Sequence, residues 1–197
     1  MKVLFSVPLL LCLFLVGCQN SVSIEPITSV TNPSWDGGKA YEVMVVGFAY
    51  SSDNRIQFED HVTKLLKRSG VKARQSYEIY PALQTLTVPA MDSYLSSSPK
   101  AAILFGHAVA VTHDEVNHGK RKTTTGLMGG TESVDWDVEV GALLESALYV
   151  SEAPTAVWVD RMRLRAEGDV GVSALNIYIK NLSSALKRDR IIQRLKE

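Results

Sequence analysis

A short apolar run, followed by an amphipathic helical pattern, most constrains the fold of this chain. Residues 41–48 read Tyr-Glu-Val-Met-Val-Val-Gly-Phe, a β-branched run of the kind that a buried strand requires. Asp53 or Asn54 can cap the helix that follows, and Gly70 can end it in a left-handed conformation. Residues 71–77 then read as a second strand, so the segment predicts a βαβ unit. The apolar positions at helical spacing are Phe58, Val62, Leu65 and Leu66.

The remaining patterns extend this unit into one α/β domain. A weaker helix can run over 88–97 with Thr87 as its cap, and 101–112 reads as a strongly apolar strand. Residues 134–150 and 156–165 predict an antiparallel hairpin. A final helix begins near Asp169 or Ser173, with Leu175, Ile179, Leu182 and Leu186 as its apolar stripe. The predicted fold class is therefore α/β (α+β), with a mixed sheet of about five strands packed by two to three helices, a βαβ start, and a C-terminal hairpin plus helix.

One segment breaks the regular pattern. Residues 113–133 combine charged and polar side chains with glycines that include Gly126, Gly129 and Gly130, and with consecutive threonines that include Thr124 and Thr125. Such a composition is typical of a long mobile loop or of an irregular hairpin. We expect Thr124 and Thr125 to belong to a contact surface if the protein binds a partner.

The strand predicted at 156–165 carries a stripe of arginines. Side chains alternate along a strand, so Arg161, Arg163 and Arg165 share one face. They form either a solvated face paired with acidic residues such as Glu139 and Glu145, or a binding face for a partner. The opposite face of the same strand is apolar and carries Trp158, Met162 and Leu164, with Asp160 among them.

One carboxylate pair invites a catalytic interpretation, and a further carboxylate has an unusual position. Glu59 and Asp60 are adjacent on the first helix, where successive residues diverge by about 100°, so their side chains do not converge on one substrate atom. Glu59 can instead pair with Arg55 one turn earlier, which favours a structural role. Asp160, on the apolar face of its strand, is expected either at the rim of the sheet or as an acceptor for a neighbouring helix.

A histidine group offers the alternative function. His107, His113 and His118 lie within a dozen residues together with Asp114, and imidazoles with a carboxylate can bind a divalent metal. A metal-dependent hydrolase is therefore the alternative to a non-enzymatic protein. The spacing matches no known ligand pattern, and the sequence contains no glycine-rich phosphate loop, nucleophile elbow or paired CxxC motif. We expect no cofactor.

The first eighteen residues bear on localisation. Lys2 precedes the apolar run 3–16, which is shorter than the roughly 20 residues of a spanning helix. The run closes on Leu15-Val16-Gly17-Cys18, which resembles the lipobox of bacterial lipoproteins. The resemblance implies that residues 1–17 are a signal peptide, that Cys18 receives the lipid anchor, and that Gln19 favours the outer membrane, with the domain facing the periplasm. The alternative is an ordinary secreted protein in which Cys18 is incidental.

The predicted domain organisation follows from the leader. Residues 18–38 are rich in Ser, Thr, Asn and Pro and read as a flexible tether, and 39–197 form a single domain. Trp35, within the tether, can lie at the membrane interface or dock onto the edge of the domain. Cys12 lies in the leader and Cys18 is consumed by lipid, so the domain must be stabilised by its core without disulfides. The formal net charge of +0 gives no global bias toward nucleic acid, and we expect no nucleic-acid partner.

A set of positions between residues 35 and 81 resembles a known family. The spacing of Trp35, Val45-Val46-Gly47, Arg55, Phe58-Glu59-Asp60, Gly70-Val71, Ser76-Tyr77 and Pro81 is similar to that of uncharacterised bacterial lipoproteins of the DUF4136 type. More distantly, the domain resembles the α/β module of the TolB amino-terminal domain, the penicillin-binding-protein activator lipoprotein and the curli-secretion lipoprotein. The resemblance implies a binding or assembly module of the cell envelope, with an envelope protein or polymer as its partner.

Overall fold

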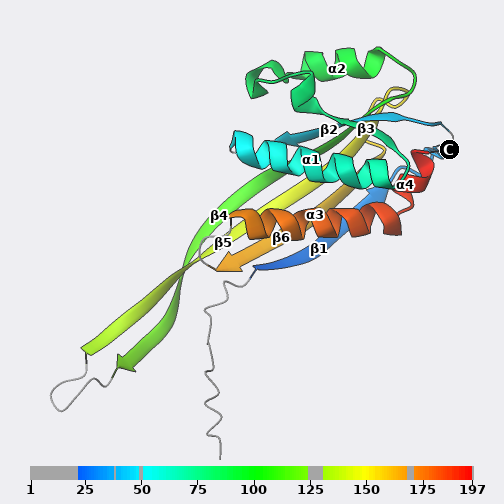
Figure 1. Ribbon diagram of the computed structural model, residues 1–197. Coiled ribbons are helices and arrows are strands. Elements are labelled where there is room, and N and C mark those ends of the chain that lie inside the picture. The colour runs from blue at the N-terminus through cyan, green and yellow to red at the C-terminus, as the bar shows by residue number, and fades with distance from the viewer. Residues whose placement is uncertain (1–21, 38, 49–50, 124–130, 168–170, 197) are drawn as a thin grey trace, which may run out of the picture.

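The computed structural model describes residues 22–37, 39–48, 51–123, 131–167 and 171–196. Of residues 111–123, 131–140, 167 and 171–172 it describes only the backbone. Within these residues the chain forms one mixed sheet in the order β1-β6-β5-β4-β2-β3, with helices on both of its faces (Figure 1). The strands are β1 (Val22–Thr31), β2 (Glu42–Phe48), β3 (Lys72–Gln75), β4 (Ala101–Thr123), β5 (Thr131–Val150) and β6 (Trp158–Glu167). The helices are α1 (Ser52–Arg68), α2 (Val88–Ser96), α3 (Gly171–Arg188) and α4 (Ile191–Arg194), with short 3₁₀ turns η1 (Ser76–Glu78) and η2 (Leu83–Thr85).

The predicted βαβ unit is confirmed. β2 pairs in parallel with both β3 and β4, and α1 connects β2 to β3. The helix begins one turn earlier than predicted, because Ser51 is its N-cap and accepts a hydrogen bond from the backbone N–H of Asn54. Gly70 follows the C-cap with a φ of +84°, as expected for a residue that ends a helix in the left-handed region.

The structure corrects the prediction that residues 18–38 form a tether. Val22–Thr31 is an edge strand of the sheet, antiparallel to β6, with Val22 opposite Ala166. Its register shifts between Pro26 and Thr28, which interrupts the alternation of side chains that identifies a strand in a sequence. The sheet accordingly has six strands and not about five. Residues 18–21, including Cys18, lie outside the described residues.

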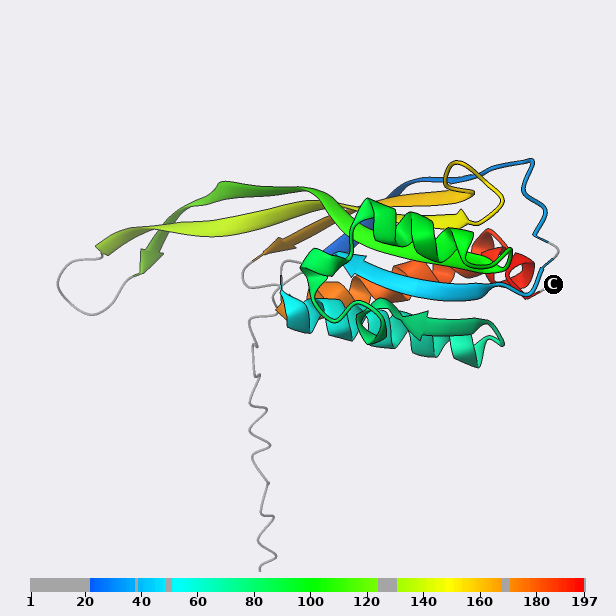
Figure 2. The same ribbon diagram turned by 90° about the horizontal axis from the view of Figure 1, so that it is seen from above.

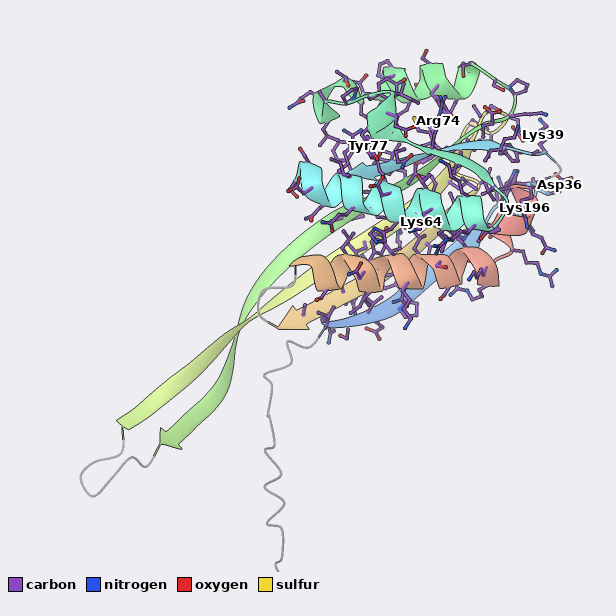
Figure 3. All side chains as sticks on the ribbon, viewed as in Figure 1. Asp36, Lys39, Lys64, Arg74, Tyr77 and Lys196 are labelled. Carbon is purple, nitrogen blue, oxygen red and sulfur yellow. The ribbon has the colours of Figure 1, made fainter. Side chains whose placement is uncertain are left out.

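Trp35 docks onto the domain, which was one of its two predicted positions. Its side chain is buried, and its Nε1 donates a hydrogen bond of 3.2 Å to the hydroxyl of Tyr41. Arg194 lies over the indole ring, 5.5 Å from its centroid, and donates to the Trp35 carbonyl at 2.6 Å. Burial and a hydrogen bond to Glu152 raise the pKa of Tyr41 to about 12. Trp35 and Gly37 thus lie against Arg194 of α4, and Figure 3 shows Asp36 near Lys196, which follows this helix.

The segment predicted as a loop or irregular hairpin is mostly a hairpin. β4 and β5 pair from Ala102 opposite Val150 to Thr123 opposite Thr131, with bulges at 108–110 and 117–120. β2 pairs with β4 only as far as His107, and β6 pairs with β5 only as far as Glu139. Residues 115–123 and 131–138 therefore continue past both neighbouring strands as a two-stranded ribbon, which we call the β4–β5 arm (Figures 1 and 2). The predicted contact residues Thr124 and Thr125 lie outside the described residues.

Two apolar clusters lie on opposite faces of the sheet. The larger cluster packs α1, α3 and α4 against β2, β4, β5 and β6, and the smaller one packs α2 and the 3₁₀ turns against β2 and β4. The predicted stripe of the last helix is confirmed, since Ile179, Leu182 and Leu186 are buried and Leu175 packs against the cluster. A Cβ added at Gly106 would come within 2.5 Å of Phe58, so the absence of a side chain there lets α1 approach the sheet.

Candidate functional site

The carboxyl end of β2 lies beside β4 in the sheet. α1 covers one face of these strands and α2 covers the other, and the crevice at such a point is where open α/β sheets usually bind ligands. Here the protein's own side chains fill it. Arg55 is 3% exposed and Glu59 0% exposed, and Arg55 Nε lies 2.9 Å from Glu59 Oε1, as the sequence predicted.

Within the described residues, the hydrogen bonds of this buried pair all go to other groups of the protein itself. Glu59 accepts hydrogen bonds from the backbone N–H of Gly47 at 3.1 Å, the Ser76 hydroxyl at 2.7 Å and the backbone N–H of Tyr77 at 3.0 Å. Arg55 Nη2 donates to the Ser76 hydroxyl and to the carbonyl of Tyr80, each at 2.9 Å. The pair therefore joins α1 to β2 and to the turn after β3. Its charges are used to hold the fold and are not presented to a substrate.

The neighbouring carboxylate contributes to the same joint. Asp60 accepts hydrogen bonds from the Tyr77 hydroxyl at 2.6 Å and from the side-chain amide of Gln75 at 2.9 Å. The hydrogen bond to Asp60 raises the pKa of Tyr77 to about 12. Glu59 and Asp60 thus bind different donors of one segment, which fits the predicted structural role.

Of the three predicted histidines, the structure describes the side chain of His107 and only the backbone of His113 and His118. His107 is partly buried on β4, with its ring centroid 4.9 Å from that of Phe105, and its register partner on β5 is Glu145. The bulge at 108–110 shifts the alternation, so positions 107 and 113 fall on opposite faces of the sheet. His118 lies in the second bulge. Among the residues with described side chains, no group of three His, Cys, Asp or Glu could hold a metal ion.

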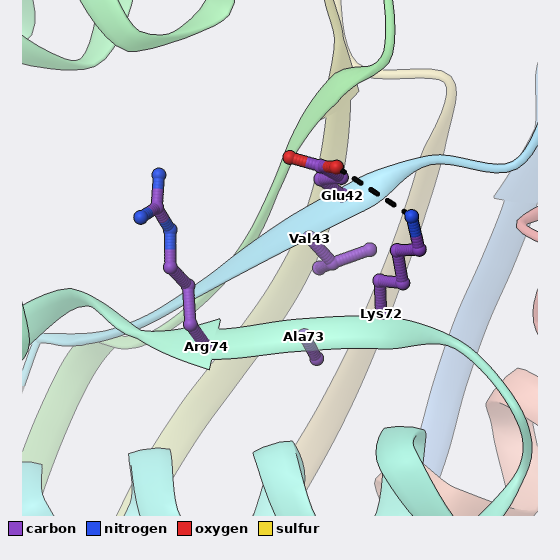
Figure 4. A pocket seen from close by; sticks show the side chains of 5 residues that line it. All are labelled: Glu42, Val43, Lys72, Ala73 and Arg74. Atoms are coloured by element: carbon purple, nitrogen blue, oxygen red, sulfur yellow. Dashed lines mark ion pairs between the residues drawn. The ribbon is translucent and has the colours of Figure 1, made fainter.

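A shallow pocket lies at the β2–β3 edge of the sheet. It has a volume of about 140 Å³ and is lined by Glu42, Val43, Lys72, Ala73 and Arg74 (Figure 4). Ligand pockets usually measure about 300–1,000 Å³. The ion pair across it, 3.8 Å between Lys72 Nζ and Glu42, joins two largely exposed side chains. This pocket is too small and too open for a specific small-molecule site.

The predicted arginine stripe lies on a part of the sheet that no helix of the described residues covers. α2 covers β2 and β4 only, so the same side of β5, β6 and β1 is open, and we call it the open face (Figure 2). Arg161, Arg163 and Arg165 are all exposed on it. The opposite side of β6 carries Trp158, Met162 and Leu164, which are buried as predicted.

Two of the arginines have acidic partners. Arg161 Nε lies 2.6 Å from the carboxylate of Glu145, which confirms one predicted pair. Arg163 lies 3.9 Å from Glu25 of β1, a partner that the sequence analysis missed because it placed residue 25 in a tether. Glu139, the other predicted partner, has only its backbone described and lies opposite Glu167. The guanidinium groups of Arg161 and Arg163 remain half-exposed, so these pairs leave them accessible to a further anion.

The apolar side of β6 ends in a second charged cluster. Asp160 is 1% exposed, and burial raises the pKa of its carboxyl although Arg188 lies 3.4 Å away. Asp189 accepts hydrogen bonds from Trp158 Nε1 and Arg188 Nε, both at 2.9 Å, and from the Ser29 hydroxyl. These bonds outweigh burial and lower the pKa of Asp189. Asp160 therefore accepts a hydrogen bond from α3, a neighbouring helix, which is one of the two predicted arrangements.

These observations define a mixed α/β protein with one open sheet face, a projecting two-stranded arm and a crevice filled by its own ion pair. No helix in the described residues has the length and apolar character needed to cross a membrane. The chain is similar to two structures of the PelC dodecamer from Paraburkholderia phytofirmans, one of them a single-residue variant. The first is 13% identical with a TM-score of 0.42 over 89% of this chain and 98% of that one. The second is 16% identical with a TM-score of 0.42 over 85% and 98%.

No protein-family model and no curated protein matches the chain. The resemblance to lipoproteins of the DUF4136 type and to the TolB-like module is therefore not supported by these comparisons and stays a prediction.

Proposed function

We propose that this protein is a non-enzymatic accessory module of the cell envelope, attached to the outer membrane through lipid on Cys18 and facing the periplasm. Its partner is an envelope protein or polymer, and the β4–β5 arm is the element that reaches it. The arm is the observation that carries the proposal.

The arm has the features of a binding element. Its two strands are paired with each other, while β2 and β6 have already ended, so the outer backbone edges of both strands carry no neighbouring strand of this sheet. With about eight residues per strand, at about 3.3 Å per residue, it extends some 25 Å beyond the sheet. Isolated two-stranded ribbons are marginally stable, so a partner that adds a strand or covers a face would stabilise the arm.

The crevice supports the non-enzymatic part of the proposal. An enzyme of this architecture would present polar groups at the carboxyl ends of β2 and β4, where Arg55 and Glu59 instead satisfy each other and the backbone around them. Positions 107 and 113 lie on opposite faces of the sheet, so the alternative, a metal-dependent hydrolase, has no observation that favours it.

Site-specific crosslinking in cells tests the arm. A photoreactive residue at Thr123, the last residue of β4, is compared with one at exposed Lys64 on α1. We expect one reproducible envelope component to be captured from position 123 and not from 64. The capture should be lost in a Cys18→Ala background, which leaves the chain without its anchor. Equal capture from both positions would contradict the arm as the binding element, and unchanged membrane fractionation of Cys18→Ala would contradict the anchor.

A further inference from the structure

The first strand of the sheet begins almost directly after the predicted anchor. Three residues separate Cys18 from Val22, the first residue of β1. Even a fully extended chain gives four residue steps a reach of about 14 Å. A lipid on Cys18 would therefore hold this end of the sheet next to the membrane surface, whereas a tether of twenty residues would let the domain turn freely.

The arginine stripe lies beside that end. Ser23 is opposite Arg165, Glu25 is opposite Arg163, and Thr28 is opposite Arg161. The order of the arginines on β6 thus follows the distance along β1 from the anchor, with Arg165 nearest. Cys18 lies five residue steps from Ser23, so the Arg165 backbone is within about 23 Å of the anchored residue.

The open face has the chemistry of a surface that contacts lipid headgroups. It presents the three exposed arginines, and guanidinium groups bind phosphate with planar, paired hydrogen bonds. The carboxylates that face them in the described side chains are Glu25, which is mostly exposed and 3.9 Å away, and Glu145, which is mostly buried. Val30, two residues beyond Thr28 on the same side of β1, is 59% exposed and adds apolar area at this face.

We propose that the open face of β1, β6 and β5 lies against the membrane that holds the anchor, with Arg161, Arg163 and Arg165 contacting the phosphates of anionic phospholipids. This inference rests on the proposed lipid anchor at Cys18. The lipid fixes the protein to the membrane, and the arginines fix its orientation, which leaves α1 and α3 turned toward the periplasm.

The orientation is measurable with a single thiol, because the anchored chain has no free cysteine once Cys12 is removed with the leader and Cys18 carries lipid. Thr28→Cys places the thiol beside Arg161, and Lys64→Cys places it on the exposed side of α1. The lipidated full chain is anchored in vesicles of phosphatidylethanolamine and phosphatidylglycerol, or of phosphatidylcholine alone. The rate of reaction with a membrane-impermeant maleimide is then compared.

We expect the Thr28→Cys thiol to react several-fold more slowly on the anionic vesicles than on the neutral ones, and added salt to restore its rate. The Lys64→Cys thiol should react equally on both. Replacing the three arginines by Gln should abolish the slowing at position 28, while the matched change of Lys64, Lys67 and Arg68 to Gln should preserve it. The salt dependence of the otherwise unchanged chain tests the same contact should the arginine variant fold poorly.

Two results separate the inference from the anchor on which it rests. A chain that floats with the vesicles but shows equal rates at position 28 on both lipids overturns the orientation and leaves the anchor intact. A wild-type chain that does not float with either vesicle overturns the anchor and the orientation together.

Discussion

At the scale of single residues, the most constrained side chain is Glu59. It is fully buried, and it links α1, β2 and the turn after β3 through four donors. The sequence predicted the Arg55–Glu59 pair, because the two residues are four apart on a helix. It could not predict the contacts to Ser76 and Tyr77, which depend on where β3 ends in space.

Glu59→Gln tests the structural role of this pair. The amide keeps the shape of the carboxylate but leaves the buried guanidinium of Arg55 without its counterion, so we expect a loss of about 3–5 kcal/mol in the free energy of unfolding. Denaturant unfolding measures the loss. Lys72→Gln, which breaks the exposed pair with Glu42, is the control and should cost less than about 1 kcal/mol. A Glu59→Gln protein as stable as the wild type would refute the structural assignment.

The pKa values of Asp189 and Asp160 are shifted in opposite directions, so we expect the two residues to change the free energy of unfolding with pH in opposite senses. The pKa of Asp189 is lowered in the folded state, so its stabilising contribution is present above about pH 4 and is lost as the pH falls through the folded pKa. Asp189→Asn should therefore lower the free energy of unfolding by about 1–3 kcal/mol at pH 7, with a smaller difference in acid. Unfolding curves between pH 3 and about pH 7 measure this.

The matched variant is Asp160→Asn. Burial raises the pKa of Asp160, so the folded state holds this proton more tightly than the unfolded chain, and stability declines as the pH rises above about 4. Asp160→Asn removes that decline, and its stability relative to the wild type should rise with pH. The same pH trend in both variants would contradict the assignment of the two carboxyl groups.

At the scale of elements, the helices and strands whose apolar residues recur at a regular spacing were predicted well. Those whose spacing is interrupted were not. The run 41–48 and the stripe of Phe58, Val62 and Leu66 give β2 and α1, because burial on one side imposes a regular spacing. β1 was missed because it is an edge strand with a register shift at Pro26, so its few apolar residues do not alternate. The extent of β4 and β5 was missed because both strands continue past β2 and β6, and the sequence of this part shows no regular apolar spacing.

The contact between α1 and the sheet gives an element-scale prediction. Phe58 lies over Gly106, where an added Cβ would meet its ring at 2.5 Å and the Tyr178 hydroxyl at 3.1 Å. Gly106→Ala should push α1 away from β4 and reduce the free energy of unfolding by about 1–3 kcal/mol. Adding Phe58→Leu should restore part of the loss in a double-mutant cycle. Additive effects of the two substitutions would show that the helix does not close on the sheet at this point.

At the scale of the whole molecule, the fold class was predictable and the placement of its surfaces was only partly so. Alternation along 158–165 was enough to separate the arginine stripe from the buried side of β6. It was not enough to show that Glu25 faces the stripe, since that contact needs a strand from the other end of the sequence. The interpretation of residues 18–38 changes most, because β1 and the docking of Trp35 incorporate 22–37 into the domain.

The pairing of β1 with β6 also sets an order for assembly. Val22 lies opposite Ala166, so β1, the first strand of the described sheet to be synthesised, has no partner until β6, the last one, has been made. Contacts so distant in sequence form slowly, because a long loop has to close first. A chain stalled before residue 158 would present β1 without a neighbour, and a chaperone that shields exposed strands would have its greatest effect in that interval.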